Sequence, residues 1–306
     1  MKVLITGASG YIGQLAGAQL TKQNIKTIGL DIHVREDSPF PIFKMDILNP
    51  ELSTWLKENQ ISHVVHLASL LQTTGDRQRD FEIDVGGTQN VLDACIAANV
   101  KHITVTSSGA AYGYYKDNPE WLTESDTIRG NYEFPYSWNK RKVEEMLAEY
   151  GNKHPELKQL ILRPGTVLGA KTRNLITNLF MKKRIMAIQG SDSPFVFIWD
   201  QDVAAIVTKG VMETKVGKFN LAGTGALTIG AIAKKLNKPL LMLPAWLIKT
   251  ALFFGHKVGA TQYGPEQIDF LRYRPVLDNS ALINEFGYLP EKTSEEVFDL
   301  FVDNLK

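Results

Sequence analysis

The first half of the chain alternates short apolar runs, rich in β-branched residues, with longer segments in which apolar residues recur at helical spacing. The apolar runs are KVLIT, KTIGLD, HVVHLA, HITVTSS and KQLILRP. Helical segments run up to about Gln23, over FEIDVGGTQNVLDACIAANV and after Pro135. Strands joined by helices of this length imply crossover connections, and therefore a parallel sheet that is covered on both faces. The pattern predicts a doubly wound α/β domain.

The pattern changes after Arg163, because the chain that follows, and everything from Leu240 onward, is mostly helical. We therefore predict two parts. Residues 1–164 form the sheet domain, and residues 165–306 form a smaller part that binds a substrate. Short strands near residues 196–199 and 218–221, in VFIWD and KFNLAG, are expected to return to the large sheet.

Composition and charge exclude several classes of protein. Apolar residues make up 44% of the 306 residues and charged residues 22%, as in ordinary globular proteins. The net charge of +1 gives no overall indication of a nucleic-acid partner or a membrane surface. Cys95 is the only cysteine, which excludes an internal disulfide and fits a reducing compartment. The chain opens on MKVLITG, which already has the pattern of a strand, so we expect no signal peptide and a cytoplasmic location.

Three glycines stand between the first predicted strand and the first predicted helix, in ITGASGYIG. Glycine is needed there for a tight turn, for close approach of a pyrophosphate and for packing of helix on strand, the roles open to Gly7, Gly10 and Gly13. The amides at the helix N-terminus would face the phosphates. Asp31, at the end of the second strand, is placed to accept hydrogen bonds from a ribose 2′-hydroxyl, which favours NAD over NADP. Arg35 is close enough in sequence to keep NADP open.

A second motif narrows the identification. The glycine loop has the form TG-x-x-G-x-x-G, and YSWNK supplies a Y-x-x-x-K motif. Together they resemble the extended short-chain dehydrogenase/reductase family, which includes NAD-dependent epimerases and dehydratases, and the resemblance covers most of the chain. It implies a Rossmann sheet that binds NAD, followed by a smaller, mostly helical C-terminal substrate domain.

The resemblance assigns further positions beside the cofactor. MDILNP looks like the family's adenine contact, HLAS like its turn beside the cofactor, and LRPGTVLG like its loop over the nicotinamide. Asp84 stands where the family usually has Asn, which puts one backbone-ordering contact in doubt. The cofactor-binding residues implied in this way are Gly7, Ser9, Gly10, Tyr11, Ile12, Gly13, Asp31, Asp46, Ile47, Leu67, Ala68, Ser69, Thr106, Tyr136, Lys140, Pro164 and Val167.

The resemblance also implies three catalytic residues. Tyr136 and Lys140 are four apart on a predicted helix, so both can point at one ligand. A neighbouring ammonium favours the phenolate form of a tyrosine, and Lys140 could also hold the nicotinamide ribose. Ser108, in TSSGAAYG, matches the family's catalytic hydroxyl and would bond the substrate oxygen. Tyr136 would then remove the alcohol proton while hydride leaves the adjacent carbon for nicotinamide C4.

Several other features have ordinary interpretations. The six histidines show no metal-ligand spacing, so no metal is expected, and His63 and His66 are interpreted as structural. The charge run at residues 182–184 is interpreted as a solvated helix end. Tyr112 and Tyr114 could either pack their loop or contact a substrate.

Two positions bear on whether the substrate is a nucleotide sugar, because nucleotide-sugar enzymes of the family carry particular residues there. An asparagine is usual where this chain has Thr166, and an arginine that holds the pyrophosphate is usual near Phe195. Because a diphosphate needs cationic or multiple donor partners, these positions weaken a nucleotide sugar as the substrate. They do not exclude it, since Lys171, Arg173 and Arg184 could compensate.

The most apolar segment spans residues 240–255 and reads LLMLPAWLIKTALFFG. It is too short for a membrane span and is interrupted by Pro244 and Lys249. The later chain resembles family members that act on sterols and other apolar alcohols or ketones. The run from Leu240 to Phe254 could line an apolar pocket or be ordinary core, and the sequence leaves both open.

These observations predict an NAD-dependent dehydrogenase/reductase that acts on a secondary alcohol or ketone of an apolar, non-nucleotide small molecule. One alternative is a nucleotide-sugar epimerase or dehydratase, and a second is a non-catalytic NAD-binding sensor. Neither a nucleic acid nor a membrane span is expected. The family resemblance predicts a homodimer packed through the Y-x-x-x-K helix and the helix before it, with apolar contacts from Leu92, Ile96, Val143, Met146 and Leu147.

Overall fold

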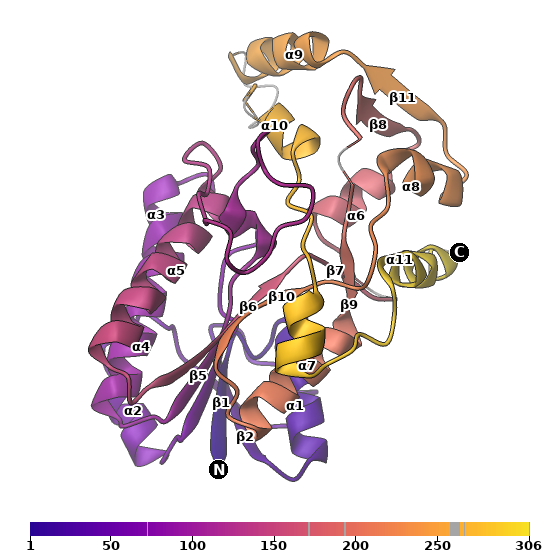
Figure 1. Cartoon of the computed structure of the whole chain (residues 1–306). Coiled ribbons are helices and arrows are strands. Elements are labelled where there is room, and N and C mark those ends of the chain that lie inside the picture. The colour runs from indigo at the N-terminus through magenta and orange to yellow at the C-terminus, as the bar shows by residue number, and fades with distance from the viewer. Residues whose placement is uncertain (72, 171, 193, 258–263, 266, 306) are drawn as a thin grey trace.

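The computed structural model describes residues 1–71, 73–170, 172–192, 194–257, 264–265 and 267–305. Seven parallel strands form its central sheet: β1 (Lys2–Thr6), β2 (Lys26–Asp31), β3 (Ile42–Lys44), β4 (His63–His66), β5 (His102–Thr106), β6 (Lys158–Pro164) and β10 (Gly217–Leu221). They lie in the order β10-β6-β5-β4-β1-β2-β3, which reverses direction between β1 and β4. This is the doubly wound α/β fold that the sequence predicts (Figure 1).

Helices cover both faces of the sheet. One face carries α2 (Leu52–Glu58), α4 (Gly87–Ala97) and α5 (Pro135–Lys153), and the other carries α1 (Tyr11–Lys22) and α7 (Asp200–Met212) (Figure 1). Two short helices, α3 (Arg77–Phe81) and η1 (Glu82–Gly86), lead into α4. Side chains of a strand alternate between the faces, so Leu4 joins the core under α4 and α5, whereas Val3 and Ile5 join the core under α1 and α7. The apolar runs of the sequence are therefore strands buried on both sides.

Two short strands test the expectation that the later chain returns to the large sheet. The strand β10 does so, because it pairs with β6 along its whole length. The strand β9 (Phe197–Trp199) does not, and that prediction is wrong: β9 pairs with β7 (Thr166–Leu168) in a separate two-stranded sheet. The edge of β6 that β9 would have needed is occupied by β10, and Phe197 packs instead into an aromatic cluster with Phe180 and Phe298.

The rest of the chain after β6 is mostly helical. Besides the elements already named, it contains α6 (Leu175–Phe180), β8 (Ile185–Ile188), α8 (Ile229–Lys235), β11 (Leu240–Leu243), α9 (Ala245–Lys257), α10 (Gln267–Arg272), η3 (Leu282–Phe286) and α11 (Ser294–Asp303). One further short helix, η2 (Gly109–Tyr112), follows β5. Strands β8 and β11 pair in parallel and lie with α9 at the end of the molecule opposite the N-terminus (Figure 1). In the described part of the chain no helix has the length and apolar character needed to cross a membrane.

The surface expected to form a dimer is mostly internal. Leu92, Val143 and Leu147 are 0%, 3% and 0% exposed, because they pack α4 and α5 onto the sheet of their own chain. They offer no surface to a partner, so that part of the expectation is wrong. Ile96 and Met146 are partly exposed, and the homodimer itself stays a prediction.

Candidate functional site

A cleft of about 1270 Å³ lies at the carboxyl ends of the strands, at the point where the strand order reverses. Doubly wound sheets bind their ligands at this point, because the loops on either side diverge and leave a crevice. The cleft exceeds the usual size of a site for one small ligand, roughly 300–1,000 Å³. The sequence-predicted residues that line it are Gly7, Gly10, Tyr11, Ile12, Gly13, Asp31, Asp46, Ile47, Leu67, Ala68, Ser69, Thr106, Ser108, Tyr136, Lys140, Pro164 and Val167.

The glycine loop forms one end of the cleft, between β1 and α1. Gly7 has a φ of +68°, and a Cβ there would lie 2.7 Å from the backbone nitrogen of Ala68. A Cβ on Gly13 would lie 2.4 Å from the carbonyl oxygen of Gly7, so the helix can approach the strand this closely only without a side chain. Gly10 caps α1 without a side-chain hydrogen bond. The amides of the first turn are therefore open to an anion in the cleft.

Asp31 ends β2 beside this loop. Its two carboxylate oxygens accept hydrogen bonds from the backbone nitrogens of Ser9 and His33, each at 3.0 Å. Ser9 is thus the one predicted residue that does not line the cleft; it holds Asp31 through its amide. Arg35 is turned to another partner, because its guanidinium forms two bonds with Asp37, at 2.9 and 2.6 Å. Arg35, the residue that left NADP possible as the cofactor, is therefore paired with Asp37 and is not part of the cleft wall.

The other end of the cleft holds the proposed catalytic residues. Tyr136 and Lys140 lie on the first turns of α5, and the Lys140 Nζ is 5.7 Å from the centre of the Tyr136 ring. Lys140 is buried and donates to the backbone oxygen of Thr106 at 3.1 Å. Ser108 follows β5, and its hydroxyl accepts from the nitrogen of Ala110 at 3.1 Å. A phenol, an ammonium and an alcohol therefore belong to residues that line one cleft.

Asp84, which stands where the family usually has asparagine, makes a contact that orders the backbone. Its Oδ1 accepts from the nitrogen of Leu70 at 2.8 Å and from the hydroxyl of Ser69 at 3.1 Å. Its Oδ2 accepts from the Asn139 side-chain amide at 3.3 Å. Asn139 belongs to YSWNK, so the acid orders the turn after β4 and ties it to the Tyr136 helix.

One cation at the substrate end of the cleft, Arg274, was not predicted from the sequence. Arg274 lines the cleft, and its Cζ lies 4.0 Å from the ring centre of Phe195 and 4.6 Å from that of Phe270. Burial lowers the pKa of Arg274 to about 10, while Tyr114 acts in the opposite direction, so the guanidinium is still charged at neutral pH. The only sequence signal was an arginine in RYRP, far along the chain from Phe195.

The three cations that could bind a substrate diphosphate do not all lie at the cleft. Arg173 lines the cleft. Arg184 is exposed and is not part of the cleft wall. Lys171 lies outside the described residues.

The apolar wall of the cleft is not the one expected. Among the described residues, none from 240 to 254 lines the cleft, so the interpretation of that run as a pocket lining is wrong. The wall is formed instead by Tyr114, Phe134 and Phe270, whose ring centres are 4.9 to 5.6 Å apart. Burial raises the pKa of the Tyr114 hydroxyl. Tyr112 packs away from the cleft, where its hydroxyl bonds Asn220 and the backbone oxygen of Thr123.

Solved structures share this fold over nearly the whole chain. The protein MoeE5, in complex with UDP-glucose and NAD, superposes with a TM-score of 0.77 and 19% identity, covering 100% of this chain and 98% of its own. The UDP-glucose 4-epimerase of Thermus thermophilus, in complex with NAD, gives a TM-score of 0.75 and 22% identity, covering 99% and 98%. At these identities the likeness concerns the fold.

Sequence relatives agree with the fold. An uncharacterized protein of Mycobacterium tuberculosis is 23% identical over 97% of this chain and 82% of its own length. The UDP-glucose 4-epimerase of Yersinia enterocolitica is 30% identical over 194 residues, which cover 58% of this chain and 56% of the enzyme. Residues 3–202, which hold the glycine loop and the Y-x-x-x-K motif, match the model of the NAD dependent epimerase/dehydratase family, and the chain belongs to that family.

Proposed function

We propose that this protein binds NAD and transfers hydride between the nicotinamide and one carbon of a substrate that carries a diphosphate, as a nucleotide sugar does. That carbon is an alcohol carbon when it gives up hydride and a carbonyl carbon when it receives it. The observation that carries the proposal is Arg274 at the substrate end of the cleft. Its guanidinium lies on the ring of Phe195, near the position where nucleotide-sugar enzymes of the family usually carry an arginine. This reverses the order of our two sequence-based hypotheses, which placed an apolar, non-nucleotide substrate first.

The residues around the glycine loop fit NAD. The open amides of the first turn of α1 would receive the pyrophosphate, and Gly7 and Gly13 leave the room that a close approach requires. The Asp31 carboxylate, held by two amides, would accept from an adenosine ribose hydroxyl and would repel a 2′-phosphate. Asp46 and Ile47 would contact the adenine.

The chemistry rests on three side chains. When bound, NAD supplies a hydride acceptor at nicotinamide C4 and can return the hydride to the same substrate. Tyr136 removes the proton of the substrate alcohol and gives it back on reduction. Ser108 bonds the same oxygen, and the Lys140 ammonium would hold the hydroxyls of the nicotinamide ribose. All three line the cleft, which argues against the non-catalytic sensor.

The substrate half of the cleft draws on the later chain. Arg173, Phe195, Phe270 and Arg274 all come from beyond residue 165, which supports the division into a cofactor part (1–164) and a substrate part (165–306). A guanidinium suits a diphosphate because it is always charged and presents several donors in one plane. A small apolar alcohol or ketone remains the second candidate, because Tyr114, Phe134 and Phe270 give the cleft an aromatic wall.

The experiment that tests the proposal is a thermal-shift screen in the presence of NAD. UDP-sugars form one arm and hydrophobic alcohols and ketones form the other. We expect extra stabilisation from a UDP-sugar, since a ligand that binds only the folded protein raises its melting temperature. Conversion of that sugar is then followed by chromatography.

Arginine variants connect the result to the cleft. Arg274→Ala is expected to weaken UDP-sugar binding by about tenfold to a hundredfold, the range for losing a charged hydrogen-bonding partner. Arg274→Lys should fall between, because it keeps the charge and loses the planar group. Arg272→Ala is the matched control, since Arg272 is not part of the cleft wall. Stabilisation by the apolar compounds alone would return the assignment to the second candidate.

A further inference from the structure

The end of the molecule formed by α9, β8 and β11 exposes a group of large apolar side chains. Trp246 is 67% exposed, Phe254 59% and Phe253 52%. Monomeric proteins rarely leave such groups in water unless they contact something. We call this surface the apolar tip; its members are Met186, Leu241, Trp246, Leu247, Phe253 and Phe254.

The apolar tip is fixed in place by the opposite face of α9. Ala245, Ile248 and Leu252 are turned inward at helical spacing, and Ile248 is buried against Ile188 of β8 and Ile268 of α10. One face of α9 is therefore packed against the rest of the chain. The aromatic side chains on its outer face have no such packing and are exposed. The helix therefore carries two apolar faces, and only one of them is covered.

The strand pair extends the same surface. Met186 of β8 and Leu241 of β11 are register partners in a parallel pair, so their side chains share one face. Both are exposed, and β11 leads through Pro244 directly into α9 (Figure 1). The exposed strand face and the outer face of α9 thus belong to one end of the molecule.

Cations accompany the apolar tip. Lys182, Lys183 and Arg184 stand just before β8, Lys249 and Lys257 lie on α9, and all five are exposed. Their segments, residues 172–190 and 236–257, contain no aspartate or glutamate. No ion pair joins any of the five to a carboxylate in the part of the chain that the structure describes. The whole chain is close to neutral, so positive charge is concentrated here.

We propose that the apolar tip docks on the surface of a lipid bilayer that contains anionic headgroups. Tryptophan and phenylalanine beside lysine and arginine are what a helix needs to lie in the interface, with its rings among the acyl chains and its cations at the phosphates. The 13 residues of α9 are too few to cross a bilayer, so the helix lies on the surface.

Charge decides between a bilayer and a second copy of the chain. Two copies joined through the outer face of α9 would bring Lys249 and Lys257 of each copy close to those of the other, and like charges across an interface oppose association. An anionic surface matches them. The inner face of α9 packs on α10, whose Phe270 lines the cleft, so the docked surface would lie one helix away from the substrate end of the cleft.

The test is sedimentation of the full-length protein with vesicles. One set contains phosphatidylcholine alone, and the other an equal mixture of phosphatidylcholine and phosphatidylglycerol. We expect binding to the mixed vesicles, weakened by salt, together with a blue shift of tryptophan emission that Trp246→Phe removes. A variant with Trp246→Ser, Phe253→Ser and Phe254→Ser should bind at least about tenfold less. Each cation removed, as in Lys182→Gln or Lys183→Gln, should cost about fivefold.

Controls keep the readout specific. Trp121→Ser removes another exposed tryptophan, outside the apolar tip, and should bind like the unchanged protein. Circular dichroism on each variant checks that it folds, and the readout needs no substrate, so it is independent of the proposed hydride transfer. The proposal is overturned if the unchanged protein ignores the mixed vesicles or if the triple variant sediments equally well. It is also overturned if light scattering shows a dimer that the triple variant loses, because the occupant would then be a second copy.

Discussion

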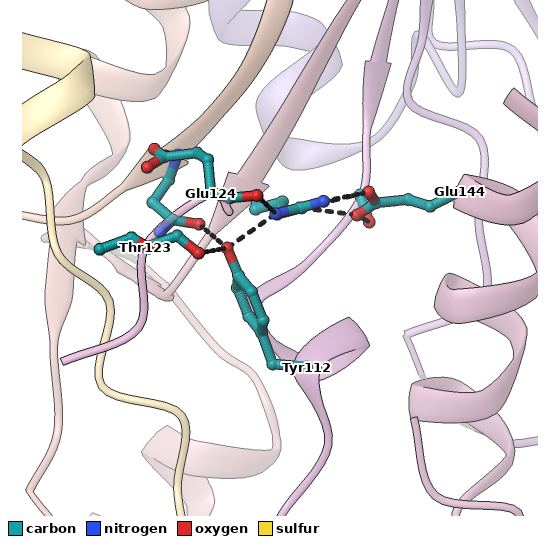
Figure 2. Close-up of polar contacts among 7 residues, drawn as sticks. Tyr112, Thr123, Glu124 and Glu144 are labelled. Carbon is teal, nitrogen blue, oxygen red and sulfur yellow. Dashed lines mark hydrogen bonds and ion pairs between the residues drawn. The ribbon is translucent and has the colours of Figure 1, made fainter. Parts of the chain in front are cut away.

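Arg163 and Glu144 form a buried ion pair directly behind the proposed catalytic residues. The Arg163 Nε and NH2 groups lie 2.9 and 2.6 Å from the Glu144 carboxylate, and the two side chains are 2% and 0% exposed. Glu144 lies one turn after Lys140 on α5 and also accepts from the hydroxyl of Ser107, next to Ser108. In Figure 2 Glu144 reaches these contacts from the right, and the Tyr112 ring rises from below with its hydroxyl among them. The pair therefore joins the ends of β5 and β6 to the Tyr136 helix.

Breaking that pair should destabilise the protein strongly. Glu144→Gln or Arg163→Met is expected to lower the free energy of unfolding by about 3–5 kcal/mol, because each leaves its partner buried without a counter-charge. Urea unfolding measures it. The control is Lys153→Met, which breaks an exposed pair with Glu149 on the same helix and should cost no more than about 0.5 kcal/mol. A small loss in the buried variants would contradict a structural role for the pair.

Tyr136→Phe should remove turnover and leave NAD binding nearly unchanged. Loss of a general acid/base costs about a hundredfold to ten-thousandfold in rate, and the ring itself is kept. Lys140→Ala should damage both quantities, since the ammonium would hold the nicotinamide ribose. Rates are measured on the substrate found in the thermal-shift screen, and NAD binding by calorimetry. Tyr150→Phe, on the same helix but bonded to Asp93 outside the cleft, is the control. Retained activity in Tyr136→Phe would rule out this tyrosine as the acid/base.

Motifs that follow parallel strands were predictable from the sequence. Gly7 follows β1, Leu67 follows β4 and Ser108 follows β5, and the carboxyl ends of parallel strands meet at one edge of the sheet. Once the fold class was read from the apolar runs, these residues had to come together. That is why all but Ser9 of the predicted site residues line one cleft.

Arg274 and the apolar run from Leu240 to Phe254 could not be predicted in this way. The contact of Arg274 with Phe195 joins distant parts of the chain, and no local pattern in RYRP marks it. The run is apolar on both faces of α9, so its periodicity cannot tell a buried helix from one that also presents a face to solvent. Similarly, the apolar residues of β9 indicate a strand but not which partner it takes.

Asp31 should set the choice of cofactor. We expect tighter binding of NADH than of NADPH, measured by fluorescence titration, and a preference that falls by about tenfold in Asp31→Ala, since loss of the carboxylate removes its repulsion of the 2′-phosphate. Asp46→Ala, also on the cleft wall, should affect both cofactors alike. Asp37→Ala would release Arg35 and should improve NADPH binding. Equal affinities in the unchanged protein would contradict the role of Asp31.

His66 should make the fold sensitive to acid. Its ring is buried between the hydroxyls of Thr6, at 2.7 Å from Nδ1, and Thr88, at 3.0 Å from Nε2. The Thr88 hydroxyl donates to the backbone oxygen of Asp84, so it accepts from Nε2, and the neutral ring completes the chain by accepting from Thr6. Burial, aided by the charge of Lys140, lowers the pKa of His66 to about 3.

The sign of the effect follows from this lowered pKa. The unfolded chain takes up a proton near pH 6.5 and the folded protein does not until about pH 3, so the stability is complete above pH 6.5 and falls as the pH drops. The slope reaches about 1.4 kcal/mol for each pH unit. His63, whose pKa burial lowers to about 4, adds to it. We expect the urea concentration at the unfolding midpoint to decrease as the pH is lowered from 7.5 to 5. The variant His66→Gln should be less stable at pH 7.5, but its midpoint should decrease less over the same pH range. An unchanged slope in His66→Gln would show that His66 is not the group responsible.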